Sequence, residues 1–467
     1  MIDSSERLPG AVPDPGRGAG APDPSLPFEH VVVVVMENHS FDNVLGALPV
    51  NGQPLADGLT FAAGKATNSN PADPELGVKG DRVYAFPLRT TEQGASISQS
   101  WNATHEQIDG GSMEGFVRSG SSTQPMGYYT PQVFPFSYWL ANTFALANRW
   151  FCSVPCQTFP NRRFLLAGTA YGLIATTRES LHDPPPPNGT IFDLMSEHGV
   201  SWRNYFTDVP ATMVIPSIIK RHRENIRPLA EFRRDCKAGT LPSVSFVDPG
   251  LGLVTEVGEF LAGHEYVRLL GDALEPIGGS EEAPQDVAFG ERWAYDVIRH
   301  ITRSPAWPRT LLIYTYDEHG GYYDHVPPPA ALLPDAIQPN LAPGDAPGGY
   351  DVYGPRVPAV VVSPYARAHA VSDTVYDHTS VLATIEAKWN LPALTYRDAN
   401  ANPVWDLLDL KTPALLEPPK PKRPRGMLLE AILDLLGIPR PIGGRRPSAT
   451  RRTTSTVESL APPPSRL

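Results

Sequence analysis

The chain has 467 residues and a formal net charge of −11, so length alone allows one large domain with insertions or roughly two or three smaller ones. The acidic balance argues against a general nucleic-acid-binding protein, because phosphate backbones favour basic partners. No apolar run reaches the ~20 residues that cross a bilayer. The N-terminal residues do not resemble a signal peptide, so we expect a cytoplasmic protein, with export left open.

Residues 1–27 are rich in Pro, Gly, Ala and Asp, which predicts a disordered or loosely draped arm. The 52 prolines and 39 glycines of the chain predict long loops around a rigid core. The three cysteines, Cys152, Cys156 and Cys236, cannot all pair, and their spacing is a poor zinc signal. We interpret them as small buried residues.

A first strand is predicted at residues 30–36, where five consecutive valines suit a parallel strand covered on both faces. Glu37 and Asn38 follow this strand directly. In open α/β sheets ligands bind at the carboxyl ends of the strands. These two polar side chains are therefore candidate ligands, although a turn before a capped helix would explain them as well.

The next segments give weaker signals. Residues 51–98 are polar and turn-rich, which predicts a long excursion with short strands such as 82–88. Residues 135–150 carry apolar side chains at helical spacing, which predicts a helix packed on the sheet.

Thr158 stands two residues before Pro160, at the start of an apolar-periodic run, which is typical of a helix N-cap. A capping hydroxyl would contribute about 1 kcal/mol to the stability of the helix and have no further role. The same place also suits a nucleophile, because helix N-termini bind anions and a hydroxyl beside a metal ion is activated for attack. Both interpretations are open at this point.

A second acidic edge is predicted further along the chain. Residues 311–315 form an apolar strand, and Asp317 and Glu318 follow it, one residue on. Two adjacent carboxylates at a buried edge repel each other, and a cation is the usual remedy. Residues 241–249 form another predicted strand that ends in Asp248, which is either a candidate site residue or an acid in a turn.

Three motifs, at residues 36–42, 316–321 and 376–380, resemble the phosphoesterase family of bacterial phospholipases C and acid phosphatase A. The resemblance covers residues 30–391 and implies an α/β, three-layer alkaline-phosphatase-like fold with a mostly parallel sheet and inserted cap segments. It implies a domain at residues 28–411. It also implies that Thr158 is the nucleophile, that Asn161 and Asp248 lie near the substrate, and that His105 and His378 serve proton transfer or orientation.

The chain departs from the family pattern at two positions. Gln99 stands where relatives often have a His, and Ala283 stands where they have a His before Pro. Alanine can neither bind metal nor donate a proton, so one site group is missing or is replaced from elsewhere, for instance by His264. The substrate remains open for this reason.

The candidate ligands Glu37, Asn38, Asp317 and Glu318, with Thr158 as a fifth, are all oxygen donors. Such a set favours Ca²⁺, Mg²⁺ or Mn²⁺ over Zn²⁺, and we expect one divalent ion. We predict a phospholipase C-like hydrolase that acts through a phospho-threonine intermediate on a phospholipid head group or a phosphorylated small molecule. The alternatives are a broad acid phosphomonoesterase and a catalytically weak metal- or phosphate-binding protein.

Residues 412–467 differ in composition and form a Pro/Arg-rich tail. Residues 427–436 form a predicted short apolar helix flanked by Lys and Arg. This pattern suits peripheral contact with anionic lipid. A helix that docks on protein explains the pattern equally well.

Overall fold

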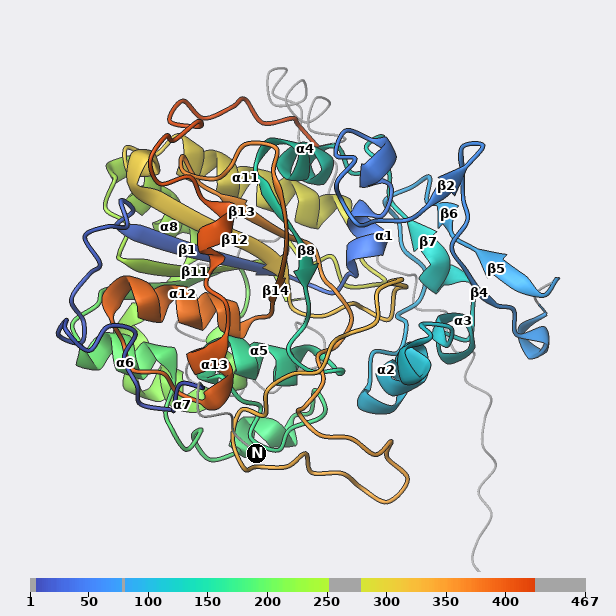
Figure 1. The fold of residues 1–467 in the computed structure, drawn as a ribbon, viewed down its shortest axis with the longest axis horizontal. Helices are drawn as coiled ribbons and strands as arrows, with labels where there is room; N and C mark the ends of the chain where they lie inside the picture. Colours follow the sequence, from blue (N-terminus) through green and yellow to red (C-terminus); the bar gives the residue numbers. More distant parts are fainter. Residues whose placement is uncertain (1–5, 78–79, 252–278, 425–467) are drawn as a thin grey trace, which may run out of the picture. The chain divides into compact units, whose positions relative to one another are not determined.

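The computed structural model describes residues 6–77, 80–251 and 279–424. These residues build an eight-stranded sheet with the order β10-β9-β11-β1-β12-β13-β8-β14 (Figure 1). Its strands are β1 (His30–Met36), β8 (Ala145–Trp150), β9 (Trp202–Phe206), β10 (Ile226–Pro228), β11 (Val244–Asp248), β12 (Thr310–Tyr316), β13 (Ala359–Val362) and β14 (Val371–Tyr376). Only β13 runs antiparallel to its neighbours in this sheet. The predicted mostly parallel α/β sheet is confirmed.

Strand β1 lies near the middle of the sheet between β11 and β12, and all seven of its residues are buried. Its valines are the reason, because β-branched side chains pack well on both faces of a covered parallel strand. The register pairs Met36 with Tyr316, the last residues of β1 and β12. The residues that follow these two strands are therefore neighbours in space.

Helices cover both faces of the sheet and complete three layers (Figure 1). One layer contains α4, α8 and α11, in which α11 contacts both α4 and α8, and the other contains α5, α6, α12 and α13. The helices are α1 (Phe41–Leu45), α2 (Trp101–Ile108), α3 (Phe116–Ser119), α4 (Pro135–Thr143), α5 (Thr158–Ala167), α6 (Ile191–Glu197), α7 (Pro216–Arg221), α8 (Leu229–Ala238), α11 (Ala288–Thr302), α12 (Thr379–Trp389) and α13 (Tyr396–Asn400). No helix in the described ranges is both long enough and apolar enough to cross a membrane.

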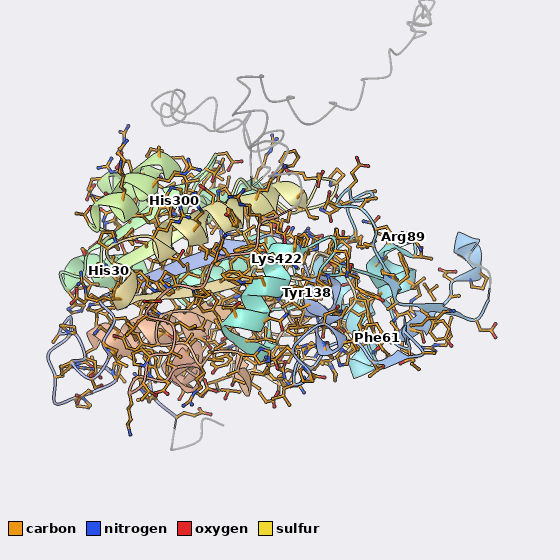
Figure 2. All side chains as sticks on the ribbon, turned by 90° about the horizontal axis from the view of Figure 1, so that it is seen from above. His30, Phe61, Arg89, Tyr138, His300 and Lys422 are labelled. Atoms are coloured by element: carbon orange, nitrogen blue, oxygen red, sulfur yellow. The ribbon has the colours of Figure 1, made fainter. Side chains whose placement is uncertain are left out.

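The chain between α1 and α4 makes a large excursion beyond the carboxyl end of β1 (Figure 1). Figure 2 labels Phe61 and Arg89 in this excursion, at the end of the domain opposite to His30, where β1 begins. Its short strands are β2 (Phe61–Ala62), β3 (Lys65–Ala66), β4 (Ser69–Pro71), β5 (Arg82–Tyr84), β6 (Phe86–Pro87) and β7 (Gly127–Tyr128). The excursion supplies the predicted cap segment, and β5 and β6 replace the single strand expected at residues 82–88.

The prediction of a single helix over residues 135–150 is wrong. Helix α4 ends at Thr143, Phe144 is extended, and β8 follows as a strand between β13 and β14. A strand buried on both faces shows a continuous apolar run, which periodicity alone does not separate from a buried helix.

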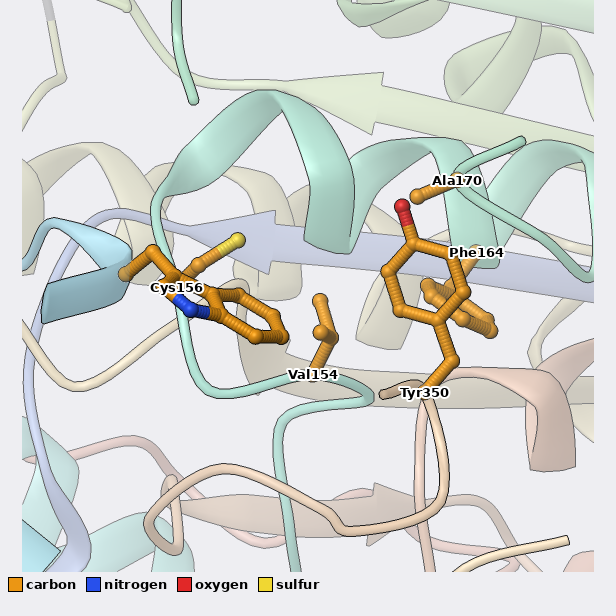
Figure 3. Packing of buried hydrophobic residues seen from close by; sticks show 6 residues of the cluster. Val154, Cys156, Phe164, Ala170 and Tyr350 are labelled. Carbon is orange, nitrogen blue, oxygen red and sulfur yellow. The ribbon is translucent and has the colours of Figure 1, made fainter. Parts of the chain in front are cut away.

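A cluster of buried side chains fixes the loop that leads into α5 (Figure 3). It consists of Trp101, Val154, Cys156, Phe164, Ala170 and Tyr350. It joins α2, the loop before α5, α5 itself and the long loop before β13. All three cysteines are free and buried, as predicted.

The described part of the N-terminal arm, residues 6–27, contacts the domain. It has no helix or strand, but Gly10 and Asp14 hydrogen-bond to the chain just after α12. The Asn390 side chain accepts from the Asp14 amide (2.8 Å) and donates to the Asp14 carbonyl (2.9 Å) and to the Arg17 carbonyl (2.5 Å). At the other end of the domain, residues 412–424 belong to the same compact unit, which runs to residue 425. The predicted helix at 427–436 lies outside the described residues.

We expect Asn390→Gly to lower the free energy of unfolding by about 1–3 kcal/mol, because three partly buried side-chain hydrogen bonds to the arm are lost. Asn390 has a φ of +50°, so glycine keeps the backbone conformation free of strain. Urea unfolding of the two proteins measures the difference. Equal stability would show that the arm contributes nothing to the fold.

Candidate active site

The two predicted acidic edges meet at the carboxyl ends of β1 and β12. The Asp317 amide donates to the Met36 carbonyl at 3.1 Å, so the strand pairing continues to the point where Glu37 and Asp317 begin. Glu37, Asn38, Asp317 and Glu318 are all buried, with at most 2% of their surface exposed. The structure therefore places all four predicted ligands directly after the ends of two paired strands.

Arg162 of α5 lies against this edge and is completely buried. Its Nε contacts Asp317 Oδ2 at 3.0 Å, and its Nη2 lies 3.5 Å from Glu37 Oε1. The sequence analysis gave Arg162 no site role, although it stands beside Asn161 in the family motif. The guanidinium is the one cation that contacts the edge among the described residues.

One guanidinium does not balance three buried carboxylates. Burial raises the pKa of Glu37, Asp317 and Glu318, and the Arg162 charge opposes that effect. Glu318 Oε1 and Asn38 Nδ2 are buried without a hydrogen-bond partner. Buried carboxylates with unsatisfied oxygens fit a hard divalent cation, which prefers oxygen ligands.

Thr158 is the first residue of α5, and Gln157 takes the N-cap position, which corrects the predicted capping role of Thr158. The Thr158 hydroxyl donates to Asn38 Oδ1 at 3.4 Å, and the residue as a whole is 9% exposed. The hydroxyl therefore lies at a helix N-terminus and next to a candidate ligand of the cation. This is the arrangement that the nucleophile interpretation requires.

Asn161 has a different environment from the one predicted. Its Oδ1 accepts from the Val154 amide, and its Nδ2 donates to the carbonyls of Val154, Cys156 and Gln157 at 2.8–3.1 Å. All of its polar atoms are used inside the protein. Asn161 therefore shapes the loop that presents Thr158, and we no longer assign it to the substrate.

His378 is likewise engaged within the protein. Its Nε2 lies 2.6 Å from the Asp317 carbonyl, and Trp150 Nε1 lies 3.4 Å from its Nδ1. Because the indole N–H can only donate, Nδ1 of His378 accepts from Trp150, and the protonated Nε2 donates a hydrogen bond to the Asp317 carbonyl. Burial lowers the pKa of His378 to about 4. His378 thus orients the Asp317 segment, and it has no N–H left for a leaving group.

The structure does not join His105 to the acidic edge. Its Nδ1 lies 2.7 Å from the Trp101 carbonyl of its own helix, and no hydrogen bond or ion pair in the described ranges links it to the four candidate ligands. Helix α2 reaches the edge through Gln107 instead. Gln107 Oε1 lies 2.7 Å from Nε2 of His319, the residue after Glu318.

Asp248, at the end of β11, is held by protein groups. Its Oδ2 accepts from Asn204 Nδ2 (2.6 Å) and from the Ala211 amide (2.7 Å). Burial raises the pKa of Asp248 to about 6, against the charge of Arg162. These contacts give Asp248 a structural role at the end of β11.

A second group of potential ligands was missed by the sequence analysis. Single ligand atoms of Asp42, Asp324 and His325 lie within 4.8 Å of one another, the only such triad in the described part of the chain. Arg356 lies among them, with its Nε 2.8 Å from Asp324 Oδ1 and its Nη2 3.4 Å from Asp42 Oδ1. Burial alone would lower the pKa of His325, but the Asp42 and Asp57 carboxylates raise it to about 10.

The charges of this second group balance without a metal ion. Arg356 and the His325 imidazolium face the carboxylates of Asp42 and Asp324. Both cations also contact the Asp57 carboxylate, whose Oδ2 lies 2.6 Å from Nη1 of Arg149. We interpret the group as an ion-pair network. Part of the signal was present in the sequence, because Asp42 ends the first motif and Asp324 lies three residues after the second.

The segment around Ala283, where the chain departs from the family pattern, borders a pocket at the acidic edge. The pocket is lined by Asn38, Ser96, Ile97, Gln99, Glu282, Ala283, Gly320 and Tyr322. Gln99 Nε2 lies 3.5 Å from Glu282 Oε1. Both positions at which the chain departs from the family pattern therefore border the same pocket. The proposed substitute His264 lies outside the described residues.

Comparisons with known proteins agree with these motifs. The sequence profile described as "Phosphoesterase family" matches residues 28–392. Non-specific phospholipase C1 of Arabidopsis thaliana is 33% identical over 80% of this chain and 69% of its own length, and non-specific phospholipase C6 of the same plant is 30% identical over 83% and 73%. Phospholipase C A of Mycobacterium tuberculosis (strain ATCC 25618 / H37Rv) is 27% identical over 87% and 81%.

Among solved structures, an alkaline phosphatase superfamily protein from Vibrio parahaemolyticus aligns with a TM-score of 0.34 and 13% identity, over 71% of this chain and 72% of the other. A phosphonate monoester hydrolase of Agrobacterium radiobacter aligns with a TM-score of 0.37 and 11% identity, over 83% and 78%. The family match covers most of the chain and the whole acidic edge. The chain belongs to the phosphoesterase family, and it is a hydrolase that acts on phosphoric ester bonds.

Proposed function

We propose that the protein is a metal-dependent, phospholipase C-like phosphodiesterase with Thr158 as its nucleophile. The observation that carries this proposal is the 3.4 Å contact between the Thr158 hydroxyl and Asn38 at the edge formed by Glu37, Asp317 and Glu318. A hydroxyl in this place has a helix N-terminus on one side and a cluster of oxygen ligands on the other. Both features favour a phosphoryl group.

The residues that would hold the cation are Glu37, Asn38, Asp317 and Glu318, with the Thr158 oxygen as a further ligand. A divalent cation bound there would supply positive charge at the phosphoryl oxygens and favour the deprotonated form of the Thr158 hydroxyl. All proposed ligands are oxygen atoms, which favours Ca²⁺, Mg²⁺ or Mn²⁺ over Zn²⁺.

The reaction then has two steps. Thr158 Oγ1 forms a bond to phosphorus, and the bond from phosphorus to the diacylglycerol oxygen breaks. The released alcohol takes up a proton from water, which balances the proton that the Thr158 hydroxyl gives up to water. Water then attacks the threonine ester of the head-group phosphate, which restores the hydroxyl and releases the phosphorylated head group. Arg162 stays paired with Glu37 and Asp317 and keeps the edge in place.

The diester assignment rests on the relatives, whose names describe phospholipases C of plants and mycobacteria. Family membership favours an enzyme over a catalytically weak binding protein. The monoesterase alternative has no separate observation in its favour, so it enters as an outcome of the experiment below.

Thr158→Ala should lower turnover of p-nitrophenyl phosphorylcholine by on the order of 10³-fold or more, because the attacking oxygen is removed. Thr158→Ser should keep a measurable rate. The melting temperature should stay close to that of the native protein, since the lost side chain makes one long hydrogen bond.

The matched control is Thr90→Ala, at an exposed threonine, which should behave like the native protein. A native rate in Thr158→Ala would rule out the threonine mechanism. Hydrolysis of p-nitrophenyl phosphate in preference to the choline diester would replace the diesterase assignment with that of a phosphomonoesterase.

A chelator should abolish hydrolysis and lower the melting temperature, and added Ca²⁺, Mg²⁺ or Mn²⁺ should restore both. Glu318→Gln should remove this metal-dependent stabilisation, because it deletes a proposed ligand charge. Asp324→Asn should destabilise the protein equally with and without metal, because it breaks the pair with Arg356. Thermal unfolding of both variants, with chelator and with metal, makes the comparison. Metal-dependent stability that is lost in Asp324→Asn and kept in Glu318→Gln would move the cation to the ion-pair network.

A further inference from the structure

Residues 91–99, which we call the strap, cross the pocket at the acidic edge. They lie in the cap excursion between β6 and α2 and contain no helix or strand. Ile97 is the one buried residue of the nine, and a Cβ atom added to Gly321 would come within 2.6 Å of its Cγ2 atom. Because Gly321 follows Glu318 by three residues, this contact lays the strap on the turn that leaves the acidic edge.

The Gln93 side chain ties the strap to two other parts of the chain. Its Nε2 donates to the carbonyls of Glu281 (2.5 Å) and Gln285 (2.8 Å), and its Oε1 accepts from the Tyr322 hydroxyl (2.5 Å). The two carbonyls flank the segment that lines one wall of the pocket, and Tyr322 belongs to the wall that follows β12. One side chain therefore holds the strap against both walls.

The other contacts of the strap are also hydrogen bonds between neutral groups. Ser96 Oγ donates to the Ala283 carbonyl at 2.6 Å. On the side of the cap, Gln107 Nε2 donates to the Ser98 carbonyl and Gln124 Nε2 to the Ala95 carbonyl, at 2.8 and 3.0 Å. Segments with few buried apolar contacts and an exposed backbone open locally more readily than core elements. The strap has these properties, whereas the walls that follow β1 and β12 are fixed by the sheet.

The strap closes the way from the surface to the Thr158 hydroxyl. Ser96, Ile97 and Gln99 line the pocket, and so does Asn38, which accepts the hydrogen bond from Thr158. The pocket contains about 170 Å³ of empty space, less than the ~300–1,000 Å³ of pockets that take up small molecules. A phosphodiester cannot reach the hydroxyl along this pocket unless one of its walls moves.

We infer that the strap is a lid over the acidic edge and that Gln93 is its latch. The inference rests on the proposed function, because it takes the pocket as the route of the substrate to Thr158, and it adds the segment that regulates entry. In the closed form the strap keeps water away from the carboxylates and the hydroxyl, which is the general use of lids in enzymes. In the open form the pocket gains the room that a phosphodiester needs.

Thiol labelling measures the opening without any turnover. Ala283 is buried beneath the strap, and the three native cysteines are buried as well. Ala283→Cys in the full chain should therefore react slowly with dithiobis(nitrobenzoate). Addition of Gln93→Ala should raise this labelling rate on the order of tenfold or more, because three hydrogen bonds are lost and each typically changes an equilibrium about two- to tenfold.

Two controls separate opening of the strap from unfolding. Gln338→Ala, at an exposed glutamine outside the strap, is the matched control and should leave the labelling rate of Ala283→Cys unchanged. Gln93→Ala without the introduced cysteine should show no faster reaction of the native cysteines, because these lie in the core. Ser96→Ala covers the case in which Gln93→Ala does not fold. It removes one hydrogen bond, so it should raise the rate about two- to tenfold.

Hydrolysis of p-nitrophenyl phosphorylcholine then shows whether the substrate uses this route. The apparent affinity of a ligand increases with the fraction of molecules that can bind it. Gln93→Ala, with Ala283 intact, should therefore raise kcat/KM by about the same factor as the labelling rate, through a lower KM.

An unchanged labelling rate in both Gln93→Ala and Ser96→Ala would overturn the lid, and so would faster labelling with an unchanged kcat/KM, because the substrate would then enter elsewhere. If the native protein hydrolyses no ester while labelling responds to both variants, the proposed function is refuted and the strap still opens over the pocket. Hydrolysis combined with unresponsive labelling would refute the lid alone.

Discussion

The site depends on the contact between Arg162 and the carboxylates at the ends of β1 and β12. Glu37 and Asp317 are neighbours because the two strands are paired up to their last residues. Without Arg162 these buried acids would have no positive partner among the described residues, and removal of one member of such a group typically costs about 3–5 kcal/mol. The guanidinium therefore makes it possible for the strand ends to carry ligand-type side chains. It also fixes α5 against the sheet, since Arg162 belongs to the first turns of that helix.

The position of Thr158 follows from the same contact. Asn161 ties the loop before α5 to the start of the helix through four hydrogen bonds, and the packing of Cys156 and Phe164 holds the loop from the other side. His378 holds the Asp317 backbone in the same way. These residues do not need to touch a substrate. They restrict the places of the hydroxyl and the carboxylates, which is how a rigid scaffold lowers the entropy cost of a reaction.

The sequence was sufficient for β1, β11 and β12 and for the acidic edge, because these are local patterns. Valine runs show buried strands, and a polar residue directly after such a strand lies at the sheet edge by geometry. The roles of Asn161, His378 and His105 were not predictable in this way, because they depend on which backbone groups lie within reach in the folded chain. The division of residues 135–150 into α4 and β8 was missed because a buried strand and a buried helix both read as apolar runs. The ion-pair network at Arg356 was missed because Asp42 lies more than 280 positions from His325 and Arg356 in the sequence, and only the folded chain brings them together.

Residues of one acidic cluster stand close in the sequence to residues of the other. The balance between negative and positive charge is what distinguishes the two clusters. At Arg356 each carboxylate faces a cation that the protein itself provides, so the cluster is complete and can serve only as a structural anchor. At Arg162 the carboxylates outnumber the protein's own cations, and Glu318 keeps an oxygen without any partner. Such an imbalance does not stabilise the fold. Replacing even a complete buried ion pair by apolar residues often leaves the stability of a protein unchanged or raises it. The proposed function accounts for this imbalance, because a divalent cation bound at the edge would face the unsatisfied oxygen of Glu318 and would lie beside the Thr158 hydroxyl.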